Sequence, residues 1–220
     1  NAWFLCTLGA RRALTFLEQQ TQVDASKLGV YGHSMGGKLT VLTAAADKRV
    51  KAAAPSCGGI SDRSGKTPLQ RNTVGDSPNL KNISCPTIFL SPANDFHGRI
   101  SDLITATDEL GHNDWRVTCS AHINHKDLPE NEVATQLWFD QYLKGSFKWP
   151  AIPSSTLTLK TESGSPHFTI KPDTSIPIAA IDIYYTQQGE VSGDMQNHII
   201  QFWHHAQPQA AGKDGAWSAE

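Results

Sequence analysis

Apolar and polar positions over residues 10–145 follow two alternating patterns, and the alternation predicts the fold class. Short apolar runs bounded by turn residues are typical of buried strands, whereas apolar residues three or four positions apart are typical of helices. Strands are predicted within residues 27–32, 49–59, 85–90 and 114–122, and helices at residues 10–20, 35–48, 99–111 and 128–145. Because helix and strand alternate, we expect an α/β fold, with a mostly parallel sheet and helices on both of its faces.

The pattern changes at Trp149. The proline-rich break "WPAIPSS" is followed by short runs of β-prone residues, which turn signals separate from one another. Strands are predicted within "TLTLKT", "HFTIKP", "IAAIDIYYT" and "HIIQFWHHA". We therefore expect two domains, one over residues 1–148 and a small all-β accessory domain over residues 151–220.

One long polar stretch interrupts the first of these domains. Residues 61–83, "SDRSGKTPLQRNTVGDSPNLKNI", combine glycine, proline and charged residues without a periodic apolar pattern. Loops of this length are uncommon in a compact domain unless they have a function. We expect a long loop or a cap insertion here.

The two ends of the sequence suggest a piece of a longer protein. The chain begins "NAWFLC" without a Met and ends "GKDGAWSAE". We expect the first strands of the sheet to precede residue 1, and the all-β domain to be incomplete at its C-terminal end.

The composition narrows the classes of function. With 39% hydrophobic residues and a formal net charge of −2, the chain lacks the basic surface that nucleic acid or an anionic membrane attracts. No apolar run of about 18 residues predicts a membrane-spanning helix. The cysteines are widely spaced, and no Cys or carboxylate set joins the paired histidines, so we expect no metal ion and no cofactor. The cysteines are Cys6, Cys57, Cys85 and Cys119, and the paired histidines are His122 with His125 and His204 with His205.

The stretch "KLGVYGHSMGGKLTVL" places a serine between glycines, at the junction of a predicted strand and a predicted helix. Strand, G-x-S-x-G and helix in this order form a nucleophile elbow, a sharp turn that exposes the serine above the sheet. A Cβ on Gly32 or Gly36 is expected to clash in so tight a turn, and Gly37 is expected to let the helix pack closely. The sequence therefore predicts Ser34 as a nucleophile.

The elbow requires an acid and then a histidine after later strands. Asp95 lies in "SPANDFHG" after the strand "TIFL", and His125 lies in "SAHINHKDLPE" after "WRVTC". We expect His125 to be the base and Asp95 to orient it, with the backbone N–H of Met35 in the oxyanion hole. The second oxyanion donor is expected from a loop that precedes this chain.

Each of these assignments has an alternative. Asp95 is also a turn-forming residue, and His125 could be an ordinary surface histidine. His122 is the rival base, and a structural role for His97 is as consistent with the sequence as a role in the pocket. Cys57 follows a strand near the site, and we expect a small buried residue rather than a second nucleophile. The candidate pocket residues are His33, His97 and His122.

The segments "GHSMGGK", "SPANDFHG" and "INHKDLPENEVATQLWFDQYLKG" together resemble the α/β-hydrolase superfamily, and most closely its dienelactone hydrolase and acetyl xylan esterase-like branch. The resemblance covers residues 1–148 and implies the α/β-hydrolase fold. It also implies Ser34 as nucleophile, Asp95 as acid and His125 as base. Dienelactone hydrolase itself has a Cys nucleophile, so simple dienelactone hydrolysis is not expected.

The resemblance favours a serine hydrolase that cleaves a small-molecule or carbohydrate ester, such as an acetylated carbohydrate. Two alternatives stay open. A serine peptidase of the prolyl-oligopeptidase type has the same elbow, and a catalytically silent scaffold could bind a partner through its β domain. The all-β tail resembles accessory domains of secreted bacterial hydrolases, which favours a periplasmic or extracellular location.

Overall fold

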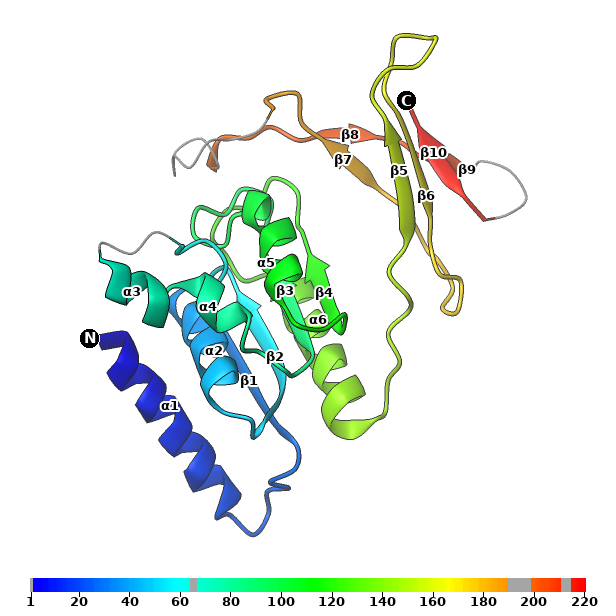
Figure 1. Cartoon of the computed structure of the whole chain (residues 1–220). Coiled ribbons are helices and arrows are strands. Elements are labelled where there is room, and N and C mark those ends of the chain that lie inside the picture. The colour runs from blue at the N-terminus through cyan, green and yellow to red at the C-terminus, as the bar shows by residue number, and fades with distance from the viewer. Residues whose placement is uncertain (1, 64–66, 190–198, 211–214) are drawn as a thin grey trace. The chain divides into compact units, whose positions relative to one another are not determined.

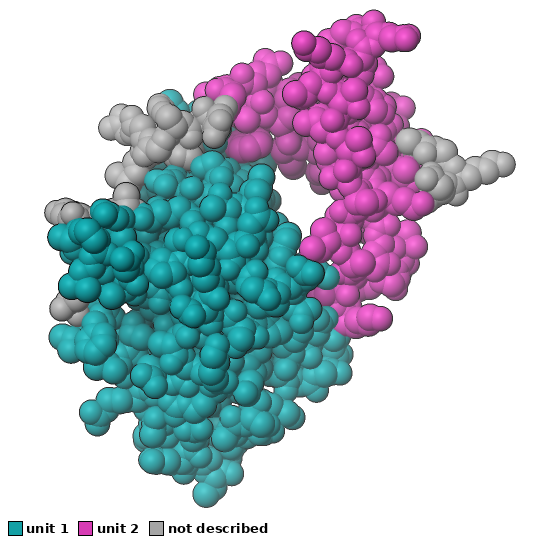
Figure 2. All heavy atoms as spheres, viewed as in Figure 1, with its two compact units in different colours: residues 1–147, 190–201 teal, residues 148–189, 202–220 magenta. Residues whose placement is uncertain are grey.

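The computed structural model describes residues 2–63, 67–189, 199–210 and 215–220 of the chain (Figure 1). The chain divides into two compact units, residues 1–147 with 190–201 and residues 148–189 with 202–220, which Figure 2 colours separately. The first unit holds every residue that the sequence predicts for catalysis.

A four-stranded parallel sheet forms the centre of the first unit, in the order β1-β2-β3-β4. Its strands are β1 (Leu28–His33), β2 (Val50–Ser56), β3 (Thr87–Leu90) and β4 (Trp115–Thr118). Strands β2 and β3 are buried almost throughout, which explains why their sequences are continuous apolar runs. The parallel sheet that the alternating pattern predicts is confirmed, and the segments after its strands meet at one edge.

Helices cover both faces of this sheet (Figure 1). Helices α2 and α5 pack with Ala53 and Phe89 in one apolar cluster, while Ile88 of β3 and Trp138 of α6 are buried outside that cluster. The helices of the unit are α1 (Ala2–Glu18), α2 (Met35–Ala46), α3 (Pro68–Thr73), α4 (Asp76–Leu80), the 3₁₀ turn η1 (Ile100–Asp102), α5 (Leu103–Glu109), α6 (Pro129–Phe139) and the π-helical turn η2 (Asp140–Lys144). Neighbouring strand residues point to opposite faces, so α6 covers the face opposite α2.

Helix α1 begins at Ala2, eight residues before the predicted start at residue 10 (10 − 2 = 8). Only Leu14 of this helix is buried, while Phe4, Leu5 and Phe16 are more than half exposed. Apolar residues on several sides of the helix blur the periodicity on which the prediction relied. Among the described residues, no helix is both long and apolar enough to cross a membrane.

The segment over residues 61–83 contains the short helices α3 and α4, where the sequence predicts a loop or a cap insertion. Helix α3 begins with Pro68 behind a capping box, in which Thr67 and Gln70 each accept a hydrogen bond from the backbone of the other. Helices of five and six residues are too short to show a periodic apolar face, which is why the sequence did not predict them. Of the two alternatives, a loop without helices is wrong, and a cap insertion stays a prediction.

Antiparallel strands build the second unit, in two sheets with the orders β5-β6-β10-β9 and β7-β8. The strands are β5 (Ser154–Thr158), β6 (His167–Lys171), β7 (Ile183–Tyr185), β8 (His204–Ala206), β9 (Gln209–Ala210) and β10 (Trp217–Ala219). The four predicted strands are found shortened or shifted, and β9 and β10 were missed. Side chains in this unit are mostly exposed, as in all of β5, so burial barely constrains where each strand begins.

Residues 199–201 group with the first unit, although the predicted strand over residues 198–206 includes them. Ile199 is helical and Ile200 lies in a turn, and residue 198 lies outside the described residues. The side-chain amide of Asn94 donates a hydrogen bond of 2.7 Å to the carbonyl oxygen of Gln201. The division into domains at residues 1–148 and 151–220 therefore stays a prediction.

Candidate active site

Ser34 occupies the sharp turn between β1 and α2. Its backbone has φ 60° and ψ −116°, a region that residues other than glycine rarely adopt. A Cβ on Gly32 would lie 2.5 Å from the carbonyl oxygen of Gly36, and a Cβ on Gly37 would collide with the carbonyl oxygen of Ser56. The expectation for Gly36 itself is wrong, because a Cβ there would meet nothing within 4 Å. Gly32 and Gly37 are therefore the two glycines that permit the turn.

Ser34, His125 and Asp95 lie in hydrogen-bond contact with one another. His125 Nε2 is 2.6 Å from Ser34 Oγ, and His125 Nδ1 is 3.1 and 3.2 Å from the two carboxylate oxygens of Asp95. The Asp95 carboxylate is fully buried and the imidazole is 18% exposed. A carboxylate at Nδ1 favours the tautomer in which Nε2 carries the lone pair, and this lone pair faces the serine hydroxyl.

Asp95 is both a turn residue and the partner of His125. One of its carboxylate oxygens accepts hydrogen bonds from the backbone N–H groups of His97 and Gly98, at 2.6 and 2.7 Å. These bonds close the turn after β3 and fix the direction in which the carboxylate points. The two interpretations of Asp95 that the sequence left open are therefore compatible.

The loop that carries His125 is attached to the sheet on both sides of this residue. Before it, the carbonyl oxygen of Ile123 accepts a hydrogen bond of 2.9 Å from the backbone N–H of Asn94. After it, the carboxylate of Asp127 accepts hydrogen bonds from two hydroxyl groups at the ends of β1 and β2. The ring of Phe96 packs against the imidazole in a tilted arrangement, with 4.4 Å between the ring centroids. The position of His125 is thus set by its neighbours as well as by Asp95.

Asp127 forms a second carboxylate–histidine pair that the sequence analysis missed. It accepts hydrogen bonds of 2.5 Å from both Tyr31 and Ser56, and it lies 3.2 Å from His33 Nδ1. Burial, and then the Asp127 carboxylate, raise the pKa of the Tyr31 hydroxyl. Tyr31 and His33 are two positions apart on β1 and therefore share one face, which is the signal that could have predicted this pair.

The structure also places the remaining predicted residues. His97 Nδ1 lies 3.0 Å from the carbonyl oxygen of Cys57, and its ring lies edge-on to His125 at 5.9 Å. His125, rather than the rival His122, makes both contacts expected of the base; His122 lies in the same loop with φ 60°. Met35 begins α2, where the first backbone N–H groups of a helix have no partner within it.

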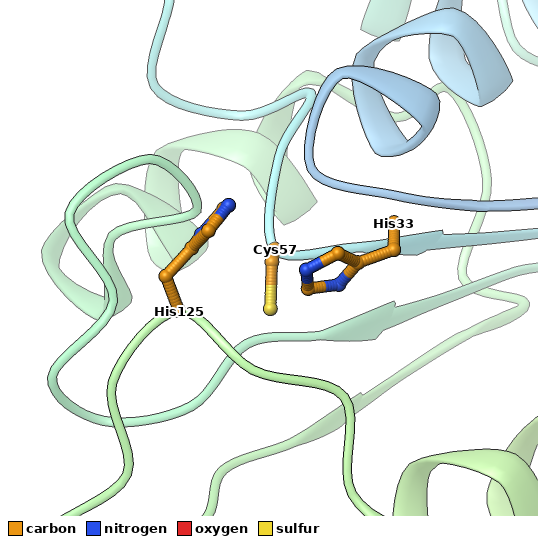
Figure 3. A group of neighbouring side chains, drawn as sticks. All are labelled: His33, Cys57 and His125. Atoms are coloured by element: carbon orange, nitrogen blue, oxygen red, sulfur yellow. The ribbon is translucent and has the colours of Figure 1, made fainter.

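Cys57 lies between two histidines in this site, as Figure 3 shows. One ligand atom from each of His33, Cys57 and His125 lies within 4.8 Å of the others. The Cys57 side chain is fully buried, as expected, and burial together with the Asp95 carboxylate raises the pKa of its thiol, which favours the protonated form. The sequence did not group these residues because they follow different strands.

A buried ion pair attaches the segment over residues 61–83 to the elbow helix. Lys38, one turn after Ser34, donates hydrogen bonds to Asp76 at 2.9 Å and to Asp62 at 2.5 Å. Lys38 and Asp76 are almost completely buried. Burial raises the pKa of Asp76, and the Lys38 ammonium acts in the opposite direction. The segment over residues 61–83 is therefore attached to α2 by a buried ion pair.

Comparisons with solved structures identify the fold. The chain resembles an acetyl xylan esterase from Paenibacillus sp. R4, with a TM-score of 0.53 and 24% identity, over 64% of this chain and 52% of that one. It also resembles a 2,6-dihydroxy-pseudo-oxynicotine hydrolase, with a TM-score of 0.54 and 18% identity, over 66% and 49%. The chain thus spans about half the length of each structure and shares the α/β-hydrolase fold with them.

Comparisons with sequences identify the family. No curated protein sequence matches the chain. The profile of the dienelactone hydrolase family matches residues 7–126, which is more than half of the 220 residues. The matched range includes Ser34, Asp95 and His125, and it contains two of the three segments that carried the resemblance, "GHSMGGK" and "SPANDFHG", with the start of the third. The resemblance is confirmed, and the chain belongs to the dienelactone hydrolase family.

Proposed function

We propose that this chain is a serine hydrolase that cleaves carboxylic esters through an acyl-enzyme on Ser34. The observation that carries the proposal is the position of His125, with Nε2 at 2.6 Å from the Ser34 hydroxyl and Nδ1 at 3.1 Å from a buried carboxylate. The strained backbone of Ser34 supports it, because such strain is retained where the surrounding structure enforces it and often serves a function.

In the acylation step, His125 Nε2 removes the proton from Ser34 as Oγ attacks the ester carbonyl carbon. The negative charge that develops on the carbonyl oxygen is stabilised by the backbone N–H of Met35 at the start of α2. Asp95 stabilises the imidazolium that forms. The alcohol then leaves with the proton from His125, and the acyl group stays on Ser34.

In the deacylation step, His125 removes a proton from a water molecule, which attacks the acyl carbonyl carbon. The tetrahedral intermediate collapses, His125 returns the proton to Ser34, and the carboxylic acid leaves. In both steps His125 acts first as general base and then as general acid, so a single correctly oriented imidazole is sufficient.

We propose a small-molecule or carbohydrate ester as the substrate. The family is one of hydrolases, and one structure with the same fold is named as an acetyl xylan esterase. An acyl group attached through oxygen has a better leaving group than an amide, so a triad with one identified oxyanion donor suits an ester best.

The proposal is tested by labelling the chain with a fluorophosphonate and locating the adduct by mass spectrometry. We expect an adduct on Ser34 that is lost in His125→Ala and retained in the matched control His122→Ala, which changes a histidine of the same loop. Labelling that is lost in His122→Ala and retained in His125→Ala would contradict the assignment of the base. An adduct on a residue other than Ser34 would contradict the assignment of the nucleophile.

The substrate class is tested with p-nitrophenyl acetate, acetylated xylan and a prolyl peptide anilide. We expect turnover of the esters that Ser34→Ala abolishes. Cleavage of the anilide alone would favour the peptidase, and labelling without turnover of either ester would remove the proposed substrate class. A folded protein that contains the expected second oxyanion donor and is neither labelled nor active would favour a silent scaffold.

A further inference from the structure

Three metal-binding side chains from three different segments meet beside the Ser34 hydroxyl. His33 ends β1, Cys57 follows β2, and His125 lies in the loop before α6. One ligand atom of each lies within 4.8 Å of the other two. In Figure 3 the His33 ring extends toward Cys57, and His125 lies on the other side of the Cys57 side chain. Two imidazoles and a thiol are the ligands that zinc prefers.

The two imidazoles are oriented as metal ligands are. Nδ1 of His125 lies 3.1 Å from Asp95, and Nδ1 of His33 lies 3.2 Å from Asp127. Metal-binding histidines usually donate one ring N–H to a carboxylate, which fixes the tautomer and makes the other nitrogen more basic. The same pairing in both rings directs the lone pair to Nε2. Each of the two imidazoles in this cluster therefore has a carboxylate partner at Nδ1.

The backbone of Cys57 adds a second observation. Its φ is 52°, a conformation that suits glycine, and two glycines follow it in the sequence. The thiol donates a weak hydrogen bond to the carbonyl oxygen of Lys126 at 3.8 Å. A glycine would remove the backbone strain at this position, whereas the cysteine keeps it and places a sulfur atom between two imidazoles.

The separations fit a tetrahedral ion. Zinc binds nitrogen at about 2.0–2.1 Å and sulfur at about 2.3 Å, which places two ligand atoms roughly 3.4–3.6 Å apart. From an upper limit of 4.8 Å, the side chains need to close by roughly one ångström, which small rotations supply. His33 and His125 are partly exposed, at 31% and 18%, so an ion can reach the cluster.

We propose that His33, Cys57 and His125 bind Zn²⁺ or a similar borderline-soft divalent ion, which takes His125 from Ser34 and so inhibits the hydrolase. On binding, the Cys57 thiol loses its proton to solvent and the thiolate binds the metal, while His33 and His125 bind as neutral imidazoles. Water fills the fourth position. The site stands on its own geometry, and only the inhibition rests on the proposed function.

Titration of the metal-free chain with Co²⁺ tests the site without any catalytic readout. A cobalt–thiolate bond gives a charge-transfer band in the near ultraviolet, which Zn²⁺ then removes by displacement. We expect one ion per chain and a band that Cys57→Ser abolishes and the matched control Cys6→Ser, an exposed cysteine on α1, retains. Ser34→Ala is expected to retain the band as well.

Two further variants keep the test valid if Cys57→Ser does not fold. His33→Ala changes a partly exposed side chain and is expected to weaken Zn²⁺ binding, measured by calorimetry, by at least about tenfold. Asp127→Asn is expected to weaken it by about 10- to 100-fold, as loss of an outer partner does. Unchanged affinity in both variants, a band that persists in Cys57→Ser, or binding lost only in His205→Ala would overturn the proposal.

The inhibition is tested separately. Zn²⁺ is expected to slow fluorophosphonate labelling of Ser34 in the unmodified chain and to leave labelling unaffected in His33→Ala. If the chain is never labelled, the proposed function fails while the cobalt band still reports the site. If Ser34 is labelled at the same rate with saturating Zn²⁺, the inhibition is wrong.

Discussion

Two carboxylate–histidine pairs lie side by side at the edge of the parallel sheet, and they differ in what each imidazole faces. In the first pair, Asp95 is fully buried and His125 Nε2 faces the Ser34 hydroxyl at 2.6 Å. In the second, Asp127 is 27% exposed and also accepts hydrogen bonds from two other hydroxyl groups. The ring centroids of the two histidines are 5.0 Å apart.

From this difference we infer that a carboxylate at Nδ1 does not by itself make a histidine a catalytic base. The first pair gains its proposed role from the elbow, which holds the Ser34 hydroxyl at Nε2 through a strained turn. The second pair uses its carboxylate to attach the loop of His125 to β1 and β2. We therefore expect substitutions in the first pair to change mainly the rate of turnover, and substitutions in the second pair to change mainly the stability of the fold.

The largest expected effect comes from the reacting atoms themselves. Ser34→Ala and His125→Ala are each expected to lower kcat for an ester by about 10⁴- to 10⁶-fold, because nucleophile and base act as a unit. His33→Ala is expected to lower it by about tenfold or less, since that ring only supports its neighbour. Steady-state kinetics measure kcat for each variant. An equal loss of kcat in His33→Ala and His125→Ala would contradict the difference that we expect between the two histidines.

The carboxylates sharpen the same comparison. Asp95→Asn is expected to lower kcat by about 10⁴-fold, because the amide favours the wrong tautomer of His125. Asp127→Asn is expected to lower the free energy of unfolding by about 1–3 kcal/mol, because two hydroxyl groups lose a charged acceptor. Urea denaturation measures the second effect. A large loss of kcat in a stable Asp127→Asn chain would make Asp127 part of the catalytic unit.

The ion pair between Lys38 and Asp76 tests how much the segment over residues 61–83 contributes to the stability of the fold. Lys38→Met is expected to lower the free energy of unfolding by about 3–5 kcal/mol, because Asp76 is left as an unpaired buried charge. The double variant Lys38→Met with Asp76→Leu removes that charge and is expected to recover most of the loss. Urea denaturation of the three chains is the measurement, and a double variant no more stable than Lys38→Met would contradict this explanation.

Alkaline pH is expected to lower the stability of the fold through Tyr31, which donates a hydrogen bond to Asp127. The pKa of Tyr31 is raised above its ordinary value of 10.0, so the folded chain keeps this proton at a pH where the unfolded chain has lost it. The stabilisation is therefore present below pH 10 and is lost as the pH rises through the pKa of the folded state. Tyr31→Phe is expected to remove this part of the pH dependence.

The measurement is urea denaturation of both chains at about pH 8 and about pH 11, on either side of the ordinary tyrosine pKa. We expect the difference in stability between the native chain and Tyr31→Phe to narrow at the higher pH. A difference that stays constant would show that Tyr31 does not titrate in this way.

The smallest effect is expected at Met35. Its side chain is 66% exposed, and its proposed contribution to the oxyanion hole is a backbone N–H that every amino acid except proline has. Met35→Ala is therefore expected to change kcat by about threefold or less. A loss beyond that range, with KM unchanged, would assign the thioether itself to the site.

Local patterns were sufficient to predict the strands β1–β3, the elbow and the order of Ser34, Asp95 and His125. Each of these depends on residues close together in the sequence: an apolar run, glycines that permit a turn, or polar residues directly after a strand. The parallel direction of the strands then brings their ends together. This is why Asp95 and His125, which lie far from Ser34 in the sequence, were found.

Features that depend on which strands are neighbours were not found. Asp127 contacts Tyr31, Ser56 and His33 only because the loop after β4 returns across β3 to β1 and β2. Cys57 joins the histidines for the same reason. The short helices α3 and α4 are stabilised by capping and by the Lys38 ion pair rather than by a periodic apolar face, and the exposed strands of the second unit carry little burial signal.

The attachment of the His125 loop at Ile123 and Asp127 has a consequence for which substrates the site can process. A base that becomes ordered only when substrate binds consumes binding energy, and a ligand with few contacts supplies little of it. Here the hydrogen bonds that the loop accepts from Asn94 on one side and from Tyr31 and Ser56 on the other order it during folding. A two-carbon acyl group therefore meets a preorganised base, and short esters are expected to lose little rate relative to long ones.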